Sequence, residues 1–192
     1  GLDKLQKVKS IVMSGTITRN DLMPIKIIKL RPDKYRMDYE LADLAAIQAY
    51  DGKTGWSTAP WTGNPKATIM DEDFEGLIFH YKEKGHQVKL SGKDTINNVE
   101  AYKIELIRKD GGTEYYCLDC KNFQLLKRTY KRIIRGKEIE METIFSDYRT
   151  VDGISFAFVN ETIMTGKRYS LIEFEKIDLN VEVNKKIFGL PE

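Results

Sequence analysis

The sequence has only two cysteines, two histidines and no long hydrophobic run. Two cysteines are too few to make a chain of 192 residues a disulfide scaffold. The apolar runs are a few residues long, whereas a membrane-spanning helix needs roughly 20. An excess of one charge is also lacking, because 31 basic and 29 acidic residues give a net charge of +2. This balance by itself indicates no polyanionic partner.

The shortage of histidine limits the enzyme classes that the chain can belong to. A Ser-His-Asp or Cys-His site would have to recruit His80 or His86. Neither has the spacing of a metal site or of a nucleophile elbow. We expect both to be partly exposed, His80 near the end of a helix and His86 at the start of a strand. We therefore expect no catalytic residue, no metal and no cofactor.

Cys117 and Cys120 form a C-x-x-C pair. Redox pairs of this kind lie at a helix start, which lowers the thiol pKa, whereas residues 115–118 are typical of a strand and residues 119–122 of a turn. The favoured interpretation is one small residue on a strand and another in a turn. A local disulfide is the alternative, if the turn brings the two Cα atoms within about 7 Å. A zinc site would need a second ligand pair.

The composition is that of a globular protein, with 41% hydrophobic and 31% charged residues. No linker interrupts the pattern, so residues 1–192 are interpreted as a single domain with a substantial core. The chain begins at Gly1 and not at methionine. We expect the natural start, with any signal peptide, to precede it.

Apolar and polar residues alternate along much of the chain, most clearly at residues 34–41. Tyr35, Met37 and Tyr39 share one face of that strand with Leu41, which is expected to face the interior. Lys34, Arg36, Asp38 and Glu40 lie on the other, which is expected to face solvent. Turn residues such as Asp51-Gly52 and Asp152-Gly153 separate the strands at short intervals. The pattern predicts a mainly β, antiparallel fold of about ten strands, closed or nearly closed into a barrel.

Three segments depart from this alternation. Residues 1–8 are expected to be the last part of a short helix that leads into the first strand. Residues 71–81 place Phe74, Leu77 and Ile78 on one face of a predicted helix, with acids at its start. Residues 56–69, rich in Pro, Gly and Trp, are expected to form a long ordered loop.

The predicted inward face consists of large side chains, many of them flexible methionines or aromatic residues. Methionine adapts to varied apolar partners, and tyrosine makes an amphipathic wall. The face is either an ordinary filled core or the lining of a ligand cavity. Its members are Met13, Met37, Met141, Met164, Tyr35, Tyr39, Tyr102, Phe156, Phe158 and Phe174.

One basic cluster stands out, at residues 127–137. Basic residues around an aromatic could hold nucleic acid, anionic head groups or an acidic patch on a partner. A solvated hairpin is the favoured interpretation, and no nucleic-acid partner is expected.

Several short motifs in order resemble one known family. They are residues 1–5 (GLDKL) leading to Ser14-Gly15-Thr16, residues 49–56 (AYDGKTGW) with Pro60, residues 151–156 (VDGISF), Asn180, and the closing residues 188–191 (FGLP). Together they resemble the periplasmic outer-membrane lipoprotein-carrier family, LolA-like, over nearly the whole chain. The turn that is Asp-Pro in that family is Asp119-Cys120 here.

The resemblance implies a half-open barrel, a short helical lid and an apolar cavity for acyl chains. Phe74, Leu77 and Ile78 would form the lid, and Trp56 and Trp61 would border the mouth. The predicted ligand-binding residues are Met13, Tyr35, Met37, Tyr39, Trp56, Phe74, Leu77, Ile78, Tyr102, Met141, Phe156 and Phe158.

The leading hypothesis is a monomeric periplasmic carrier or sensor of lipid or of an acylated lipoprotein, and not an enzyme. Membrane proteins of the envelope are further candidate partners, and a lipid anchor at the natural N-terminus stays open. One rival is a protein-binding module that uses a sheet edge or the basic hairpin. The other is an enzyme built on a buried pair of carboxylates.

Overall fold

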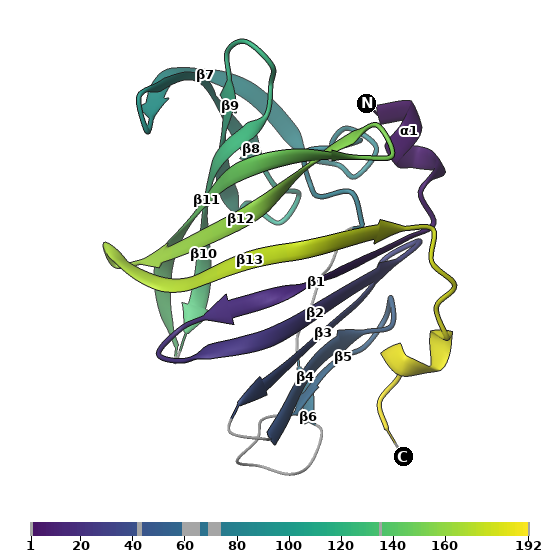
Figure 1. The fold of residues 1–192 in the computed structure, drawn as a ribbon. Helices are drawn as coiled ribbons and strands as arrows, with labels where there is room; N and C mark the ends of the chain where they lie inside the picture. Colours follow the sequence, from purple (N-terminus) through teal and green to yellow (C-terminus); the bar gives the residue numbers. More distant parts are fainter. Residues whose placement is uncertain (1, 42–43, 59–65, 69–73, 135, 192) are drawn as a thin grey trace. The chain divides into compact units, whose positions relative to one another are not determined.

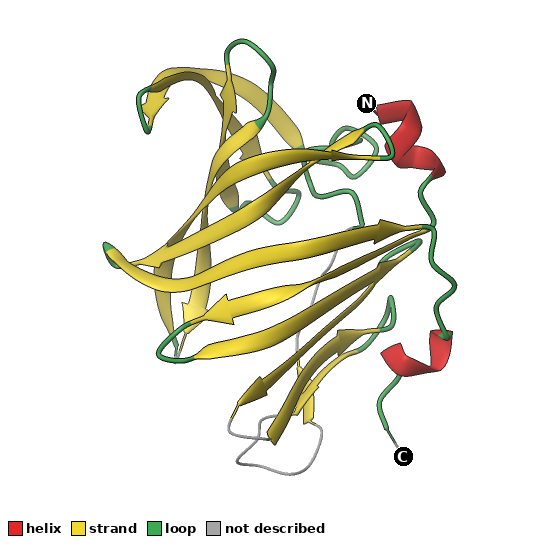
Figure 2. Cartoon of the chain, viewed as in Figure 1, coloured by secondary structure: helices red, strands yellow, loops and turns green. Residues whose placement is uncertain are grey.

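The computed structural model describes residues 2–41, 44–58, 66–68, 74–134 and 136–191. Strands dominate, and the helical elements are short (Figure 2). The chain divides into two compact units, which are described separately. The first unit comprises Gly1–Gly76, Tyr148–Phe156 and Ile172–Glu192. The second comprises Leu77–Asp147 and Ala157–Leu171.

The described residues form thirteen strands in one sheet. The neighbouring strands from β1 to β6 and from β7 to β11 pair antiparallel. Seven strands precede residue 97: β1 (Ser10–Thr18), β2 (Leu22–Leu30), β3 (Lys34–Leu41), β4 (Leu44–Tyr50), β5 (Gly55–Thr58), β6 (Lys66–Thr68) and β7 (Gln87–Ile96). Six follow: β8 (Val99–Ile107), β9 (Thr113–Asp119), β10 (Leu125–Ile134), β11 (Lys137–Val151), β12 (Ile154–Met164) and β13 (Lys167–Leu179).

The strand order is β6-β5-β4-β3-β2-β1-β13-β12-β11-β10-β9-β8-β7 (Figure 1). This order runs from one outer strand to another, so the sheet is open. The predicted mainly antiparallel β class is therefore confirmed, and an open sheet is the strand arrangement that a half-open barrel requires. The count exceeds the expected ten, partly because β5 and β6 take up described residues of the segment expected to be a loop.

A short helix is present, but it is not at residues 71–81. Helix α1 spans Leu2–Lys7, as expected for the N-terminal segment, and a 3₁₀ helix, η1, spans Lys185–Phe188. Residues 71–73 lie outside the described ranges, and residues 74–81 form bends and turns. Gly76 (φ +94°) and His80 (φ +53°) have left-handed backbone angles, which interrupt a right-handed helix. The prediction of a helix there was wrong over its described part.

The register of the first unit assigns its side chains to two faces. Met13 pairs with Ile27, and Ile27 pairs with Met37. Directly paired residues point to the same side of a sheet, so these three lie on one face. On β2 that face is buried at Met23, Ile25 and Ile27, whereas Lys26 between them is exposed.

The C-terminal segment covers part of the opposite face. Trp56 pairs with Ala49 and Ala49 with Arg36, which places all three on that side. The Trp56 indole Nε1 donates to the Phe188 carbonyl at 2.8 Å, and Arg36 Nη1 donates to the Ile187 carbonyl at 2.6 Å. Trp56 and Phe188 are fully buried. Arg36 and its ion-pair partner Asp38 are therefore only half exposed, although solvent exposure was expected.

The second unit contains two features that position the site. Strand β7 is an outer strand, largely exposed, with a bulge between Leu90 and Gly92. Strands β9 and β10 pair only as far as Tyr115 and Thr129. Beyond that point β9 continues with β8 and β10 continues with β11, so the two strands diverge.

Candidate functional site

The first unit carries a mainly apolar face across β1, β2 and β3, on which Lys29 lies between Ile11 and Tyr35. We call it the apolar face and define it by Ile11, Met13, Ile17, Met23, Ile25, Ile27, Tyr35, Met37 and Tyr39. Isoleucine side chains are buried within it, while Met13, Tyr35, Met37 and Tyr39 are each half-buried. The face therefore keeps part of its methionine and tyrosine surface accessible.

Gly15 allows the backbone of β13 to approach β1 closely beside this face. A Cβ atom at Gly15 would lie 2.7 Å from the Phe174 Cα and closer still to the Glu173 carbonyl oxygen. Only glycine permits such a close approach of β13, and glycine often marks a sharp bend at a barrel corner.

Contacts with Arg31 and Lys29 hold Phe74 and Glu75 beside the end of β2. Phe74 is buried, and the Arg31 guanidinium lies 4.4 Å from the centre of its ring. Arg31 Nη2 also pairs with Glu75 Oε1 at 2.7 Å, and Arg31 Nε donates to the Val8 carbonyl at 2.6 Å. Lys29 Nζ donates to the Phe74 carbonyl at 3.4 Å. One arginine thus connects this segment to the residues that follow α1.

The predicted ligand-binding residues are divided between the two units. The first unit contains Met13, Tyr35, Met37, Tyr39, Trp56, Phe74 and Phe156, and the second contains Leu77, Ile78, Tyr102, Met141 and Phe158. Within the first unit, four of them share the apolar face, but Trp56 lies on the opposite face under the C-terminal segment. Trp61 lies outside the described residues.

In the second unit, Tyr102 and Met141 share a face with polar groups. Tyr102 stacks on Phe123 with ring centres 6.2 Å apart, and Met141 is buried opposite Tyr130. Leu77 and Ile78 are half-buried in turns, and Phe158 is buried on β12.

A buried carboxylate, Glu114, lies on this same face of the second unit. Its Oε2 accepts hydrogen bonds from Tyr116 Oη and from Arg128 Nε, both at 2.8 Å. Burial raises the pKa of the Tyr116 hydroxyl, which stays a donor. The sequence alone does not predict this network, because Glu114 and Arg128 lie on two different strands, 14 residues apart, and resemble the surface charges around them. One hint was available, since Glu114 and Tyr116 occupy alternate positions of one strand.

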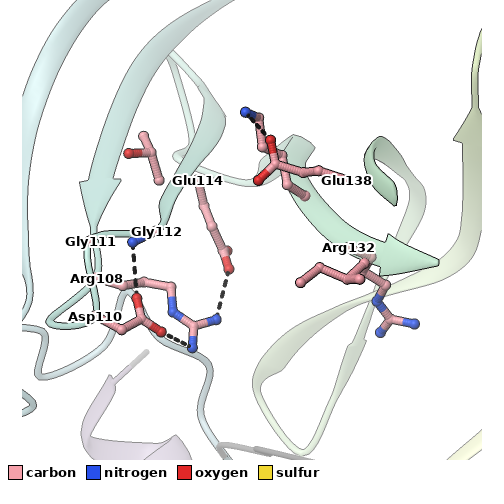
Figure 3. A pocket seen from close by; sticks show the side chains of 10 residues that line it. Arg108, Asp110, Gly111, Gly112, Glu114, Arg132 and Glu138 are labelled. Atoms are coloured by element: carbon pink, nitrogen blue, oxygen red, sulfur yellow. Dashed lines mark hydrogen bonds and ion pairs between the residues drawn. The ribbon is translucent and has the colours of Figure 1, made fainter. Parts of the chain in front are cut away.

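A pocket of about 490 Å³ opens where β9 and β10 diverge (Figure 3). Arg108 in its wall pairs with Asp110 at 2.8 Å and lies 3.9 Å from Glu114. Lys131 pairs with Glu138 at 2.6 Å. The lining is completed by Gly111, Gly112, Thr113, Arg132 and Ile133. The lining of the pocket combines polar and apolar surface, and it contains as many acidic as basic side chains.

The basic cluster at residues 127–137 is partly neutralised by carboxylates of neighbouring strands. Lys127 pairs with Glu142 at 3.3 Å, and Arg128 with Glu114. This part of the cluster fits the favoured interpretation of a solvated hairpin, whereas Arg132 and Lys137 pair with no carboxylate among the described residues.

The cysteines and histidines show no arrangement for catalysis within the described ranges. Cys117 and Cys120 are free thiols, and burial raises the pKa of Cys117, the opposite of redox activation. The expectation that His86 is partly exposed was wrong: it is buried, and its Nδ1 accepts a hydrogen bond from the Lys109 backbone N–H at 3.1 Å. No cluster of three potential metal ligands occurs among the described residues.

Comparisons with known proteins place this fold. No protein-family model matches the chain, and no curated protein sequence matches it either. The chain is similar to the crystal structure of a DUF1329 family protein from Desulfovibrio piger, with a TM-score of 0.70 and 12% identity over 98% of this chain and 92% of that one.

Two further solved structures are also similar. A LolA superfamily protein from Nitrosomonas europaea has a TM-score of 0.65 and 13% identity, covering 98% of this chain and 95% of its own. A proposed outer membrane lipoprotein-sorting protein domain from Vibrio parahaemolyticus has a TM-score of 0.61 and 15% identity, covering 97% and 94%. The chain therefore has the fold of these proteins. None of the helices in its described part is long and apolar enough to cross a membrane.

Proposed function

We propose that this protein binds lipid, or the acyl chains of a lipoprotein, as a periplasmic carrier or sensor in outer-membrane lipoprotein sorting. The apolar face of the first unit is the observation that carries the proposal. Its half-buried row of Met13, Tyr35, Met37 and Tyr39 offers adaptable apolar surface on a fold shared with lipoprotein-sorting domains.

Magnitudes favour an acyl ligand over a polar one. Each buried methylene contributes about 0.8 kcal/mol, so a chain of about sixteen carbons gains on the order of 10 kcal/mol before ordering costs. The charged groups of the second unit are mostly paired with each other. They offer less affinity, because an incoming group must displace an existing partner.

Adding bulk to the apolar face tests the proposal. Met37→Trp should weaken binding of a fluorescent fatty acid about tenfold or more, because extra volume in a packed site costs about 1–3 kcal/mol. Glu40→Trp is the matched control, since it adds the same bulk to the same strand at an exposed position on the other face. Binding is measured by fluorescence titration with the whole chain.

Two results would contradict the proposal. One is equal weakening by both tryptophan variants, which would indicate a general effect on β3. The other is a loss of fatty-acid binding when Lys131 and Arg132 are replaced by serine, together with normal binding by Met37→Trp. That result would place the binding site at the β10–β11 hairpin.

A further inference from the structure

The tip of the β10–β11 hairpin exposes an isoleucine on one face and two unpaired cations on the other. We define the hairpin tip as Lys131, Arg132, Ile133, Lys137 and Glu138. Ile133 is 79% exposed, more than any other large hydrophobic side chain of the described residues. A single exposed apolar residue needs no explanation, but its neighbours here are informative.

The charges of the hairpin tip leave two cations available. Lys131 and Glu138 neutralise each other in an exposed pair. Arg132 and Lys137 are exposed, and neither pairs with a carboxylate among the described residues. Within the described ranges, Arg132 lies over the Tyr130 ring, 5.6 Å from its centre, and its guanidinium N–H groups make no ion pair.

The pocket lies directly beside this tip. Arg132 and Ile133 line it together with Arg108 from the β8–β9 turn (Figure 3). Its volume of about 490 Å³ gives a polar head group room next to the exposed isoleucine.

We propose that the hairpin tip docks onto an anionic lipid surface. With the hairpin approaching the membrane end-on, Ile133 on one face enters the boundary between head groups and acyl chains, while Arg132 and Lys137 on the other face contact lipid phosphates. Apolar insertion flanked by cations is the general means by which peripheral segments bind anionic membranes. This surface belongs to the second unit and is independent of the acyl-binding proposal for the first.

The side chains favour lipid over nucleic acid. Single-stranded nucleic acids need exposed aromatic rings for stacking, and the nearest ring, Tyr130, is already contacted by Arg128 at 4.7 Å and by Arg132. The exposed group is aliphatic, and it suits a lipid interface.

Vesicle flotation tests this inference. The probes are phosphatidylcholine vesicles with or without about 30% phosphatidylglycerol. The protein should bind the anionic vesicles alone, and less at high salt. Ile133→Ser should weaken binding about tenfold, and Arg132→Ser with Lys137→Ser about 25-fold, or about fivefold for each cation.

Leu22→Ser is the matched control. Leu22 is 66% exposed, next to the β1–β2 turn, and follows an acidic residue, Asp21. It should change vesicle binding less than about twofold. Wild-type binding by Ile133→Ser, equal loss in Leu22→Ser, or equal binding to neutral vesicles would each overturn the inference. Fatty-acid titration of Ile133→Ser should match wild type, so the two proposals fail or succeed separately.

Discussion

At the scale of the residue, Asp51 shows how one turn is held. Its Oδ1 accepts the backbone N–H groups of Lys53 at 2.8 Å and Thr54 at 2.7 Å, which closes the β4–β5 turn. The hydrogen bond from Thr54 is the main cause that lowers the pKa of this carboxyl below 3.8, and Lys53 and Lys34 add to it against the effect of burial. The folded state therefore favours the ionised form.

Asp51→Ala should lower the free energy of unfolding by about 1 kcal/mol at pH 7. The folded-state pKa is depressed, so the stabilisation is present above the unfolded-state value and is lost as pH falls through the folded-state value. Urea unfolding of both proteins between pH 7 and pH ~2.5 measures this. Asp51→Asn keeps the acceptor oxygen and should retain most of the stability. A constant difference between Asp51→Ala and wild type at every pH would contradict the assignment.

At the scale of the element, the β9–β10 pair is joined by a charge network on its buried face. Breaking a buried pair leaves an uncompensated charge, whereas replacing both partners by apolar groups is often neutral. Arg128 is about a third exposed and Glu114 almost fully buried, so solvent weakens but does not abolish this effect.

Arg128→Met should therefore lower the free energy of unfolding by about 2 kcal/mol. Adding Glu114→Leu should restore most of that loss, because no carboxylate is then left buried. Chemical denaturation with unchanged m-values is the measurement. Strictly additive losses in the double variant would show that the two side chains are not coupled.

The elements also show what sequence alone can predict. The alternation at residues 34–41 predicted β3 with the bounds that the structure gives, and Asp51-Gly52 and Asp152-Gly153 do lie in turns. These features depend on local periodicity and on turn residues. The helix expected at residues 71–81 also had good periodicity, but Gly76 and His80 take left-handed angles there.

The candidate site could be predicted only in part, for a related reason. Met13, Met37 and Tyr39 were expected on one face and share it, since each strand alternates predictably. Trp56 lies on the other face because the register of β4 with β5 sets its direction, and no local pattern encodes register across a loop. The Glu114 network likewise depends on pairing between strands.

At the scale of the whole molecule, the two proposed surfaces should respond oppositely to salt. Apolar burial depends little on ionic strength, whereas surface charges are screened. Raising salt from about 0.05 to 0.5 M should change fatty-acid affinity less than twofold and weaken vesicle binding about tenfold or more. Calorimetry should also give a negative heat-capacity change for fatty-acid binding. Equal salt dependence of both would contradict this division.

The outer strand β7 has a consequence for self-association. The outer strand of an open sheet presents unpaired backbone N–H and C=O groups. A second copy of the chain can pair its own strand with a long exposed edge of this kind, and repeated pairing forms a fibre. Lys89 and Lys93 place charge on β7, and the bulge at Gly92, with φ at +134°, twists the edge away from a flat template. We therefore expect this edge not to add a strand from a second copy.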